Sequence, residues 1–176
     1  MVSRYTTPAI VLHWTIAVLI VGMLGVGTWM TDLKVSPTKI SLYTWHKWMG
    51  LTVLLLVLIR LGWRLRHSAP ALPAGLPNWQ LLAAKMSHIA LYVLMLAMPI
   101  TGWLQNSAAG FPLTWFGLFK VPALIARDKA SFAFWQQTHE VLAMVLMVLI
   151  AVHLLAAIKH ALARDGVFSR IWFAKE

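Results

Sequence analysis

Cysteine is absent from this sequence of 176 residues, and acidic residues are few. Without cysteine the chain cannot form disulfides, thiolate metal sites or a covalently attached c-type haem, which needs a Cys-x-x-Cys-His motif. Only 5 aspartates and glutamates stand against 15 lysines and arginines, which gives a formal net charge of +10. Basic residues interleaved with apolar spans usually mark membrane topology. We therefore expect no nucleic-acid partner.

Charged residues as a whole make up only 11% of the chain, whereas hydrophobic residues make up 60%. Ordinary soluble domains contain about 25% charged and roughly 45–50% apolar residues. A soluble core of this size cannot bury so much apolar surface, but lipid can solvate it. The composition therefore predicts an integral membrane protein, with a single domain over residues 1–176.

Four apolar stretches are long enough to be membrane spans, at about residues 9–30, 45–63, 86–104 and 134–162. Each reaches or approaches the roughly 20 residues that a helix needs to cross the hydrocarbon core. The sequence thus predicts an all-α fold, a four-helix bundle that spans the membrane.

Segments with turn chemistry separate these stretches, at about residues 32–41, 68–78 and 106–131. We expect the first to turn around Pro37, because proline punctuates helices. The third carries an aromatic run made of Phe111, Trp115, Phe116 and Phe119. Aromatic side chains favour the membrane–water interface, so we expect this loop to lie in the interface.

Lysine and arginine predict the orientation, because they are enriched in cytoplasmic loops. The cluster Arg60, Arg64 and Arg66 favours a cytoplasmic position for the connection between the second and third stretches. Both termini are then cytoplasmic, and the membrane is the bacterial inner membrane. The opposite face receives six basic residues and three acidic ones, a charge of +3. They are Lys34, Lys39, Lys47, Lys120, Arg127 and Lys129, against Asp32, Asp128 and Glu140.

Four of the seven histidines lie in the apolar stretches or at their ends: His13, His46, His139 and His153. Ionisable side chains inside a membrane are costly, face the bundle interior and usually serve a function. A single one could simply hydrogen-bond a neighbouring helix. Four of them at matched depths indicate a bound group instead.

The spacing of His139 and His153 predicts two sites stacked across the membrane. Fourteen residues of helix place them within about 40° of one face and about 21 Å apart along the axis. His13 lies near the cytoplasmic end of the first stretch, and His46 near the outer end of the second. Depth therefore pairs His13 with His153 and His46 with His139.

Two imidazoles without further ligands suit haem iron. Zinc would need four ligands, and only Glu140 lies close in sequence. A haem with two axial histidines has no open position for oxygen, so it transfers electrons. Gly22, Gly25 and Gly50 could leave room for a porphyrin, although ordinary close packing of helices explains them equally well.

Two further histidines carry weaker signals. His88 opens the third stretch and could be a haem neighbour, a quinone contact or a core hydrogen-bonding group. His160 follows Lys159 at the cytoplasmic end of the fourth stretch. It could interact with the helix dipole or donate to a ligand, and we take a quinone contact as the candidate role of His160.

Several short motifs together resemble the bacterial cytochrome b561 family, and the resemblance covers essentially the whole chain. The motifs are Arg4-Tyr5, Leu12-His13-Trp14, His46-Lys47, Gly50-Leu51, Arg60-Leu61, Trp63-Arg64, Ser87-His88, Gly102-Trp103, His139-Glu140, His153, Lys159-His160 and Arg164-Asp165. The di-haem subunits of membrane formate dehydrogenases and hydrogenases are similar as well.

The resemblance implies a four-helix bundle with two b haems stacked across the inner membrane. It implies His13, His46, His139 and His153 as axial ligands, in agreement with the depth argument. It also implies electron exchange with ubiquinone and, for one type in the family, oxidation of superoxide to oxygen at the periplasmic face. The alternative is a quinol-oxidising electron carrier, or a membrane subunit that serves a periplasmic or membrane redox partner.

Overall fold

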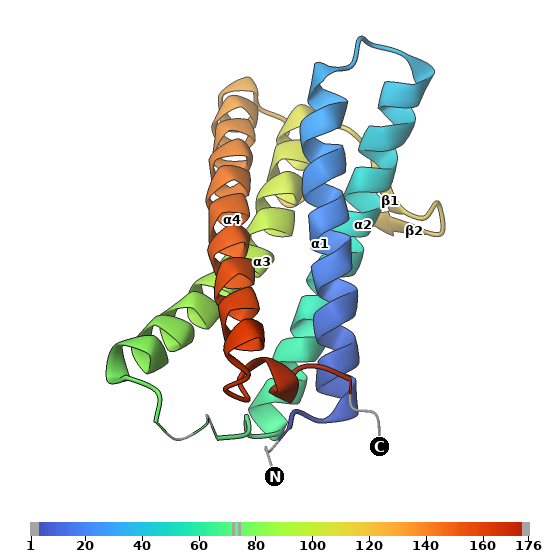
Figure 1. Ribbon diagram of the computed structural model, residues 1–176. Helices are drawn as coiled ribbons and strands as arrows, with labels where there is room; N and C mark the ends of the chain where they lie inside the picture. Colours follow the sequence, from blue (N-terminus) through green and yellow to red (C-terminus); the bar gives the residue numbers. More distant parts are fainter. Residues whose placement is uncertain (1–3, 72, 74, 174–176) are drawn as a thin grey trace.

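Four long helices form the molecule, shown as a computed structural model in Figure 1. The structure describes residues 4–71, 73 and 75–173, so the two ends of the expected 1–176 domain lie outside the described residues. The helices are α1 (Thr7–Asp32), α2 (Pro37–Arg66), α3 (Asn78–Ala109) and α4 (Lys129–Ala163). Each is long and apolar enough to cross a membrane, with mean hydropathy of 2.3, 1.6, 1.7 and 2.9 in its most apolar window. The expected four-helix membrane bundle is confirmed.

The helices are longer than the apolar stretches that predicted them, because polar residues cap and extend their ends. The expected turn around Pro37 was wrong: Pro37 is the first residue of α2. Proline fits the first turn of a helix, where its missing N–H is not needed. Ser36 caps this helix by accepting a hydrogen bond from the Lys39 N–H (3.2 Å). Asp128 caps α4 in the same way, by accepting a hydrogen bond from the Ser131 N–H (2.7 Å).

The first and the last described residues lie at the same end of the bundle (Figure 1). The N–H of Tyr5 donates to the carbonyl of Arg170 (3.1 Å), and the Trp14 indole donates to the carbonyl of Ile171 (3.0 Å). The segment after α4, which includes the short 3-10 helix η1 (Phe168–Arg170), therefore folds back under α1. We call the end of the bundle where these contacts lie the terminal end. The opposite end, where α1 connects to α2, is the loop end.

The four helices pack as two antiparallel pairs joined by a third contact. The most extensive packing is between α3 and α4, followed by α1 with α2 and then α2 with α3. Within the described part of the chain, the backbone of α4 makes few or no close approaches to α1 and α2. Space between α4 and these two helices is therefore filled by side chains or by a bound group.

An apolar core fills the middle of the bundle. Its buried members come from all four helices: Ile16, Ile20, Val53, Val57, Leu94 and Leu146. Because these helices cross the membrane, their lipid-facing surfaces stay apolar. The core separates the two ends of the bundle from each other.

The connection from α3 to α4 contains a hairpin, where the sequence suggested only an aromatic loop. Strands β1 (Leu113–Trp115) and β2 (Phe119–Val121) pair antiparallel around a turn with positive φ at Phe116 (50°) and Gly117 (73°). Three-residue strands are too short for an alternating pattern to identify. The Phe116 ring packs against Trp48 of α2 at 5.2 Å between centroids. An interfacial position of this hairpin stays a prediction.

Gly110 ends α3 in the left-handed conformation, with φ of 76°. We expect Gly110→Ala to destabilise the protein by about 1 kcal/mol, because an L-residue with a Cβ is strained there. An added Cβ would also lie 2.7 Å from the Arg127 Cδ. Gly110→Asn adds the same Cβ but tolerates positive φ, so it should lose less stability. Thermal unfolding in detergent measures both variants, and equal losses would contradict the conformational explanation.

Candidate functional site

The predicted histidine pairs face each other at the two ends of the bundle. At the loop end, the rings of His46 on α2 and His139 on α4 lie 6.3 Å apart between centroids. At the terminal end, His13 on α1 and His153 on α4 lie 6.4 Å apart. Two imidazoles bound to one metal have centroids about 6 Å apart, since each metal–nitrogen bond is about 2 Å. Both pairs have the separation that a shared iron requires.

A seven-residue spacing divides the bundle into three layers. Seven residues make about two helical turns, or about 10.5 Å of rise, and return to nearly the same face. The loop-end layer contains Gly27, His46, Gly102 and His139; the middle layer contains Ile20, Val53, Met95 and Leu146; the terminal-end layer contains His13, Arg60, His88 and His153. The middle layer belongs to the apolar core. Two polar sites are thus separated by one apolar layer.

The orientation of His139 is fixed by α3. Its Nδ1 lies 3.1 Å from the carbonyl oxygen of Met98 and 3.1 Å from the hydroxyl of Thr101. A carbonyl can only accept, so Nδ1 carries the proton and Nε2 keeps its lone pair. Backbone or hydroxyl partners on the second nitrogen are typical of metal-ligating histidines. The Nε2 atom of His139 is therefore available to bind a metal ion.

Two glycines let the loop-end imidazoles approach neighbouring helices. A Cβ at Gly27 would lie 3.1 Å from the His46 Cε1, and a Cβ at Gly102 would lie 3.1 Å from the His139 Cε1. The sequence pointed instead to Gly22, Gly25 and Gly50, which have no such contact. Gly25 lies about 200° around the helix from Gly27. The sequence could have identified Gly27, because Gly27 lies fourteen residues after His13, the same spacing that separates His139 from His153.

The residues fit a haem in each of the two end layers. Each end layer offers two facing imidazoles, and the described residues contain no cluster of three or more His, Cys, Asp and Glu that could hold another metal ion. The His46 Nδ1 is buried without a hydrogen-bond partner, so this ring does not serve to link helices. The backbone of α4 makes few or no close approaches to α1 and α2, which is compatible with a flat ring between the paired histidines.

His88 lies beside the terminal-end pair rather than in it. Its ring is 5.7 Å from that of His153. However, His88 is on α3, which packs closely along α4, so a porphyrin has no room between these two helices. Of the three roles that the sequence left open, the structure favours a neighbour of the haem site.

His160 pairs with Asp165 just beyond the end of α4. The His160 Nδ1 lies 2.5 Å from the Asp165 Oδ2. Among the described residues, this is the only contact between a basic and an acidic side chain at ion-pair distance. Burial raises the pKa of Asp165, but hydrogen bonds from His160 and from the Val167 N–H outweigh it, so the pKa is lowered from its ordinary value. Asp165 thus stays ionised at neutral pH and holds His160 Nδ1, which leaves only Nε2 for a ligand.

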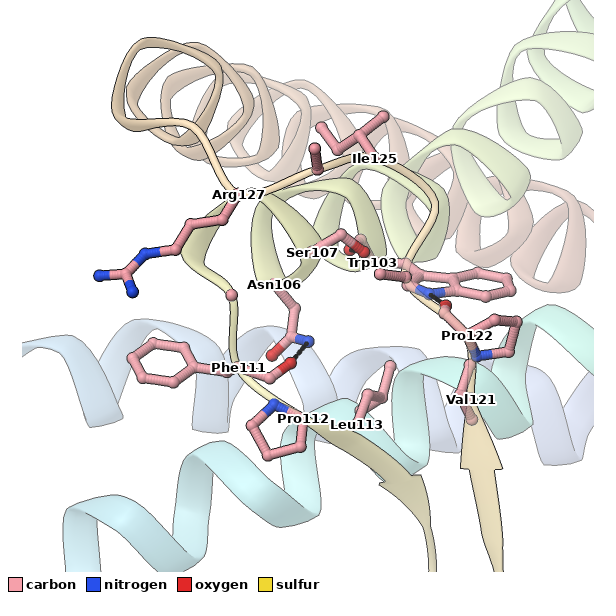
Figure 2. Close-up of a pocket in the computed structure, with 13 residues that line it drawn as sticks. Trp103, Asn106, Ser107, Phe111, Pro112, Leu113, Val121, Pro122, Ile125 and Arg127 are labelled. Atoms are coloured by element: carbon pink, nitrogen blue, oxygen red, sulfur yellow. Dashed lines mark hydrogen bonds between the residues drawn. The ribbon is translucent and has the colours of Figure 1, made fainter.

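A cavity of about 350 Å³ lies at the loop end between the last turns of α3 and the connection to α4 (Figure 2). Asn106 and Trp103, two of its polar side chains, are already engaged. The Asn106 amide donates to the Phe111 carbonyl (2.9 Å) and accepts from Lys47 (3.0 Å), and the Trp103 indole donates to the Pro122 carbonyl (2.9 Å). These bonds fasten the connection onto α3, and we assign the cavity no ligand.

We expect Gly102→Ala and Gly27→Ala to reduce haem binding at the loop end, because the added methyl group displaces an imidazole that lies 3.1 Å away. Gly22→Ala is the matched control, since nothing lies within 4 Å of its added Cβ. Haem per chain from the absorption spectrum measures the effect. Full haem content in both variants would show that the ring positions do not matter for binding.

Comparison with known proteins agrees with this geometry. A family model described as prokaryotic cytochrome b561 matches residues 4–174. Cytochrome b561 homolog 2 of Escherichia coli (strain K12) is 35% identical over 166 residues, which cover 90% of this chain and 85% of that protein. Cytochrome b561 homolog 1 of the same organism is 29% identical over 174 residues, which cover 96% and 97%. The chain therefore belongs to the prokaryotic cytochrome b561 family of membrane electron-transfer proteins, which implies b-type haem as its cofactor.

Proposed function

We propose that this protein is a di-haem b cytochrome that transfers electrons across the bacterial inner membrane to or from ubiquinone. Its best candidate reaction is the oxidation of superoxide to oxygen coupled to ubiquinone reduction. The observation that carries the proposal is the pair of facing imidazoles at each end of the bundle, 6.3 and 6.4 Å apart. A haem held by two imidazoles supplies one-electron transfer without an open position for a ligand.

The chain's own residues hold and isolate the two sites. His46 and His139 provide one ligand pair and His13 and His153 the other. Met98 and Thr101 orient His139. The middle layer excludes water between the sites, which keeps each in a low-dielectric surrounding.

Basic residues at the loop end support an anionic substrate. Lys34, Lys120 and Lys129 are exposed there. Two other lysines have structural partners: Lys39 donates to the carbonyls of Thr31 and Leu33 at the end of α1, and Lys47 donates to Asn106. A surface of one sign attracts a substrate of the opposite sign and raises its association rate.

The redox balance requires two superoxide anions for each quinone. Each superoxide loses one electron and leaves as oxygen, and the quinone takes up two electrons and two protons. We propose His160 as a quinone contact through its Nε2, because Asp165 occupies its other ring nitrogen. A histidine held by a carboxylate is a suitable proton donor.

The alternative function is a quinol-oxidising carrier, or a membrane subunit that passes electrons to a periplasmic or membrane redox partner. The β1–β2 hairpin favours it, since Leu118 and Phe119 are 76% and 62% exposed at the loop end. Re-oxidation of the haems that depends on such a partner would identify this function.

Superoxide consumption by the purified protein with ubiquinone tests the main proposal. We expect consumption faster than in buffer alone and a rate that falls as salt is added. Lys34→Glu, Lys120→Glu and Lys129→Glu combined should slow it several-fold, whereas Arg66→Glu at the other end should not. Consumption no faster than in buffer, with two haems bound and quinone supplied, would refute the superoxide reaction.

The absence of cysteine makes the orientation directly measurable. We expect Val35→Cys, at the loop end, to react with a membrane-impermeant maleimide in spheroplasts. Ala71→Cys, at the terminal end, should react only after the membrane is opened, because we place both termini in the cytoplasm. The reverse labelling pattern would invert the proposed orientation.

A further inference from the structure

The two histidine layers differ in charge. Beside its histidine pair, the loop-end layer has Gly27 and Gly102, which carry no side chain, whereas the terminal-end layer has Arg60 and His88. Arg60 lies fourteen residues after His46 on α2 and so occupies, in the terminal-end layer, the position that His46 occupies in the other. An arginine inside a membrane span is costly and usually has a functional partner.

Arg60 is held in place by two neighbouring helices. Its Nε donates to the Tyr92 hydroxyl on α3 (3.1 Å), and its Nη1 donates to the Ala9 carbonyl on α1 (2.9 Å). Both partners are neutral. Neither partner therefore balances the guanidinium charge, and its Nη2 is not used in these bonds.

Two more arginines add charge near the same layer. The Arg64 guanidinium lies 5.6 Å above the Tyr92 ring, and Arg170 is only 5% exposed, with a buried Nε that has no hydrogen-bond partner. The charges of Arg60, Arg64 and Arg170 all act on His88. Among the described residues none of the three has a carboxylate within ion-pairing distance.

The loop-end layer has a weaker positive charge nearby. Lys47 follows His46 and bonds to Asn106, while Glu140 follows His139 and adds a negative charge that acts on it. One cation and one anion nearly cancel. The terminal-end site is therefore the more positive of the two.

We propose that Arg60 and Arg64 bind the two carboxylate groups of the haem at the terminal end, and that this cluster makes that haem the one with the higher reduction potential. The inference rests on the proposed di-haem function. Haem b carries two carboxylates, and a carboxylate in low dielectric needs a cationic partner. Nearby positive charge stabilises the reduced form, which has one more electron, and so raises the potential.

The order of potentials gives electron flow a direction. A single electron shared by the two sites resides at the terminal end, so electrons entering at the loop end move toward the side of the chain termini. With the termini in the cytoplasm, this direction runs against a membrane potential that is negative inside. The arginine cluster offsets that opposition.

Potentiometric titration of the purified protein, followed by the haem absorption bands, tests the inference without an activity assay. We expect two midpoint potentials in the wild-type protein. Arg64→Gln and Arg60→Gln should each lower the higher potential and leave the lower one unchanged, and Arg60→Lys should largely retain it. Arg66→Gln is the matched control, because it removes a charge from the same helix end outside the cluster, and should shift neither.

Removal of the loop-end haem by His46→Ala assigns the potentials independently. The remaining haem should titrate near the higher wild-type value. A remaining haem that titrates near the lower value would overturn the inference, as would an unchanged higher potential in both glutamine variants with two haems bound. A wild-type protein without two haems would instead refute the proposed function.

Discussion

The two histidines of α4 constrain the rest of the bundle. They lie fourteen residues apart on one face, which places them about 21 Å apart along the helix axis. Each needs a facing imidazole at its own depth, and α1 and α2, which run in opposite directions, supply one each. His13 near the start of α1 and His46 near the start of α2 lie at opposite ends of the membrane for this reason. The apolar layer between them belongs to the buried core.

The two faces of α4 pack differently against their neighbouring helices. Its contact with α3 is close and gives His139 a fixed orientation through Met98 and Thr101. Its backbone makes few or no close approaches to α1 and α2, which is compatible with a flat cofactor between them. In lipid there is little hydrophobic gain from helix association itself. A cofactor that fills the space between α4 and its ligand partners would therefore contribute much of the stability of this half of the bundle.

Sequence reasoning predicted the pairing of the four histidines by depth, because periodicity and span length determine where a residue sits along a membrane helix. The structure brings the rings of each predicted pair together, and their role as haem ligands stays a prediction. Sequence reasoning did not find the contacts of the second ring nitrogens, since these depend on which helices pack side by side. It also missed Pro37 as a helix start, because proline breaks a helix in its interior but fits the first turn of a helix. The β1–β2 hairpin was beyond its reach, because three-residue strands have no usable pattern.

We infer the direction of electron flow from the difference in charge between the two histidine layers. The two histidine pairs have similar separations between their rings. Glycines lie beside one pair and arginines beside the other, so their electrostatic surroundings differ. Such a difference is what a protein can vary while the iron ligands remain the same.

The haem content of double variants tests most directly whether each end of the bundle holds one haem between one pair of histidines. His13→Ala combined with His153→Ala removes both ligands of one site, so the protein should keep one haem per chain. His13→Ala combined with His46→Ala removes one ligand from each site, so the protein should keep none. Equal haem loss in the two double variants, or one haem retained in the second, would contradict the pairing.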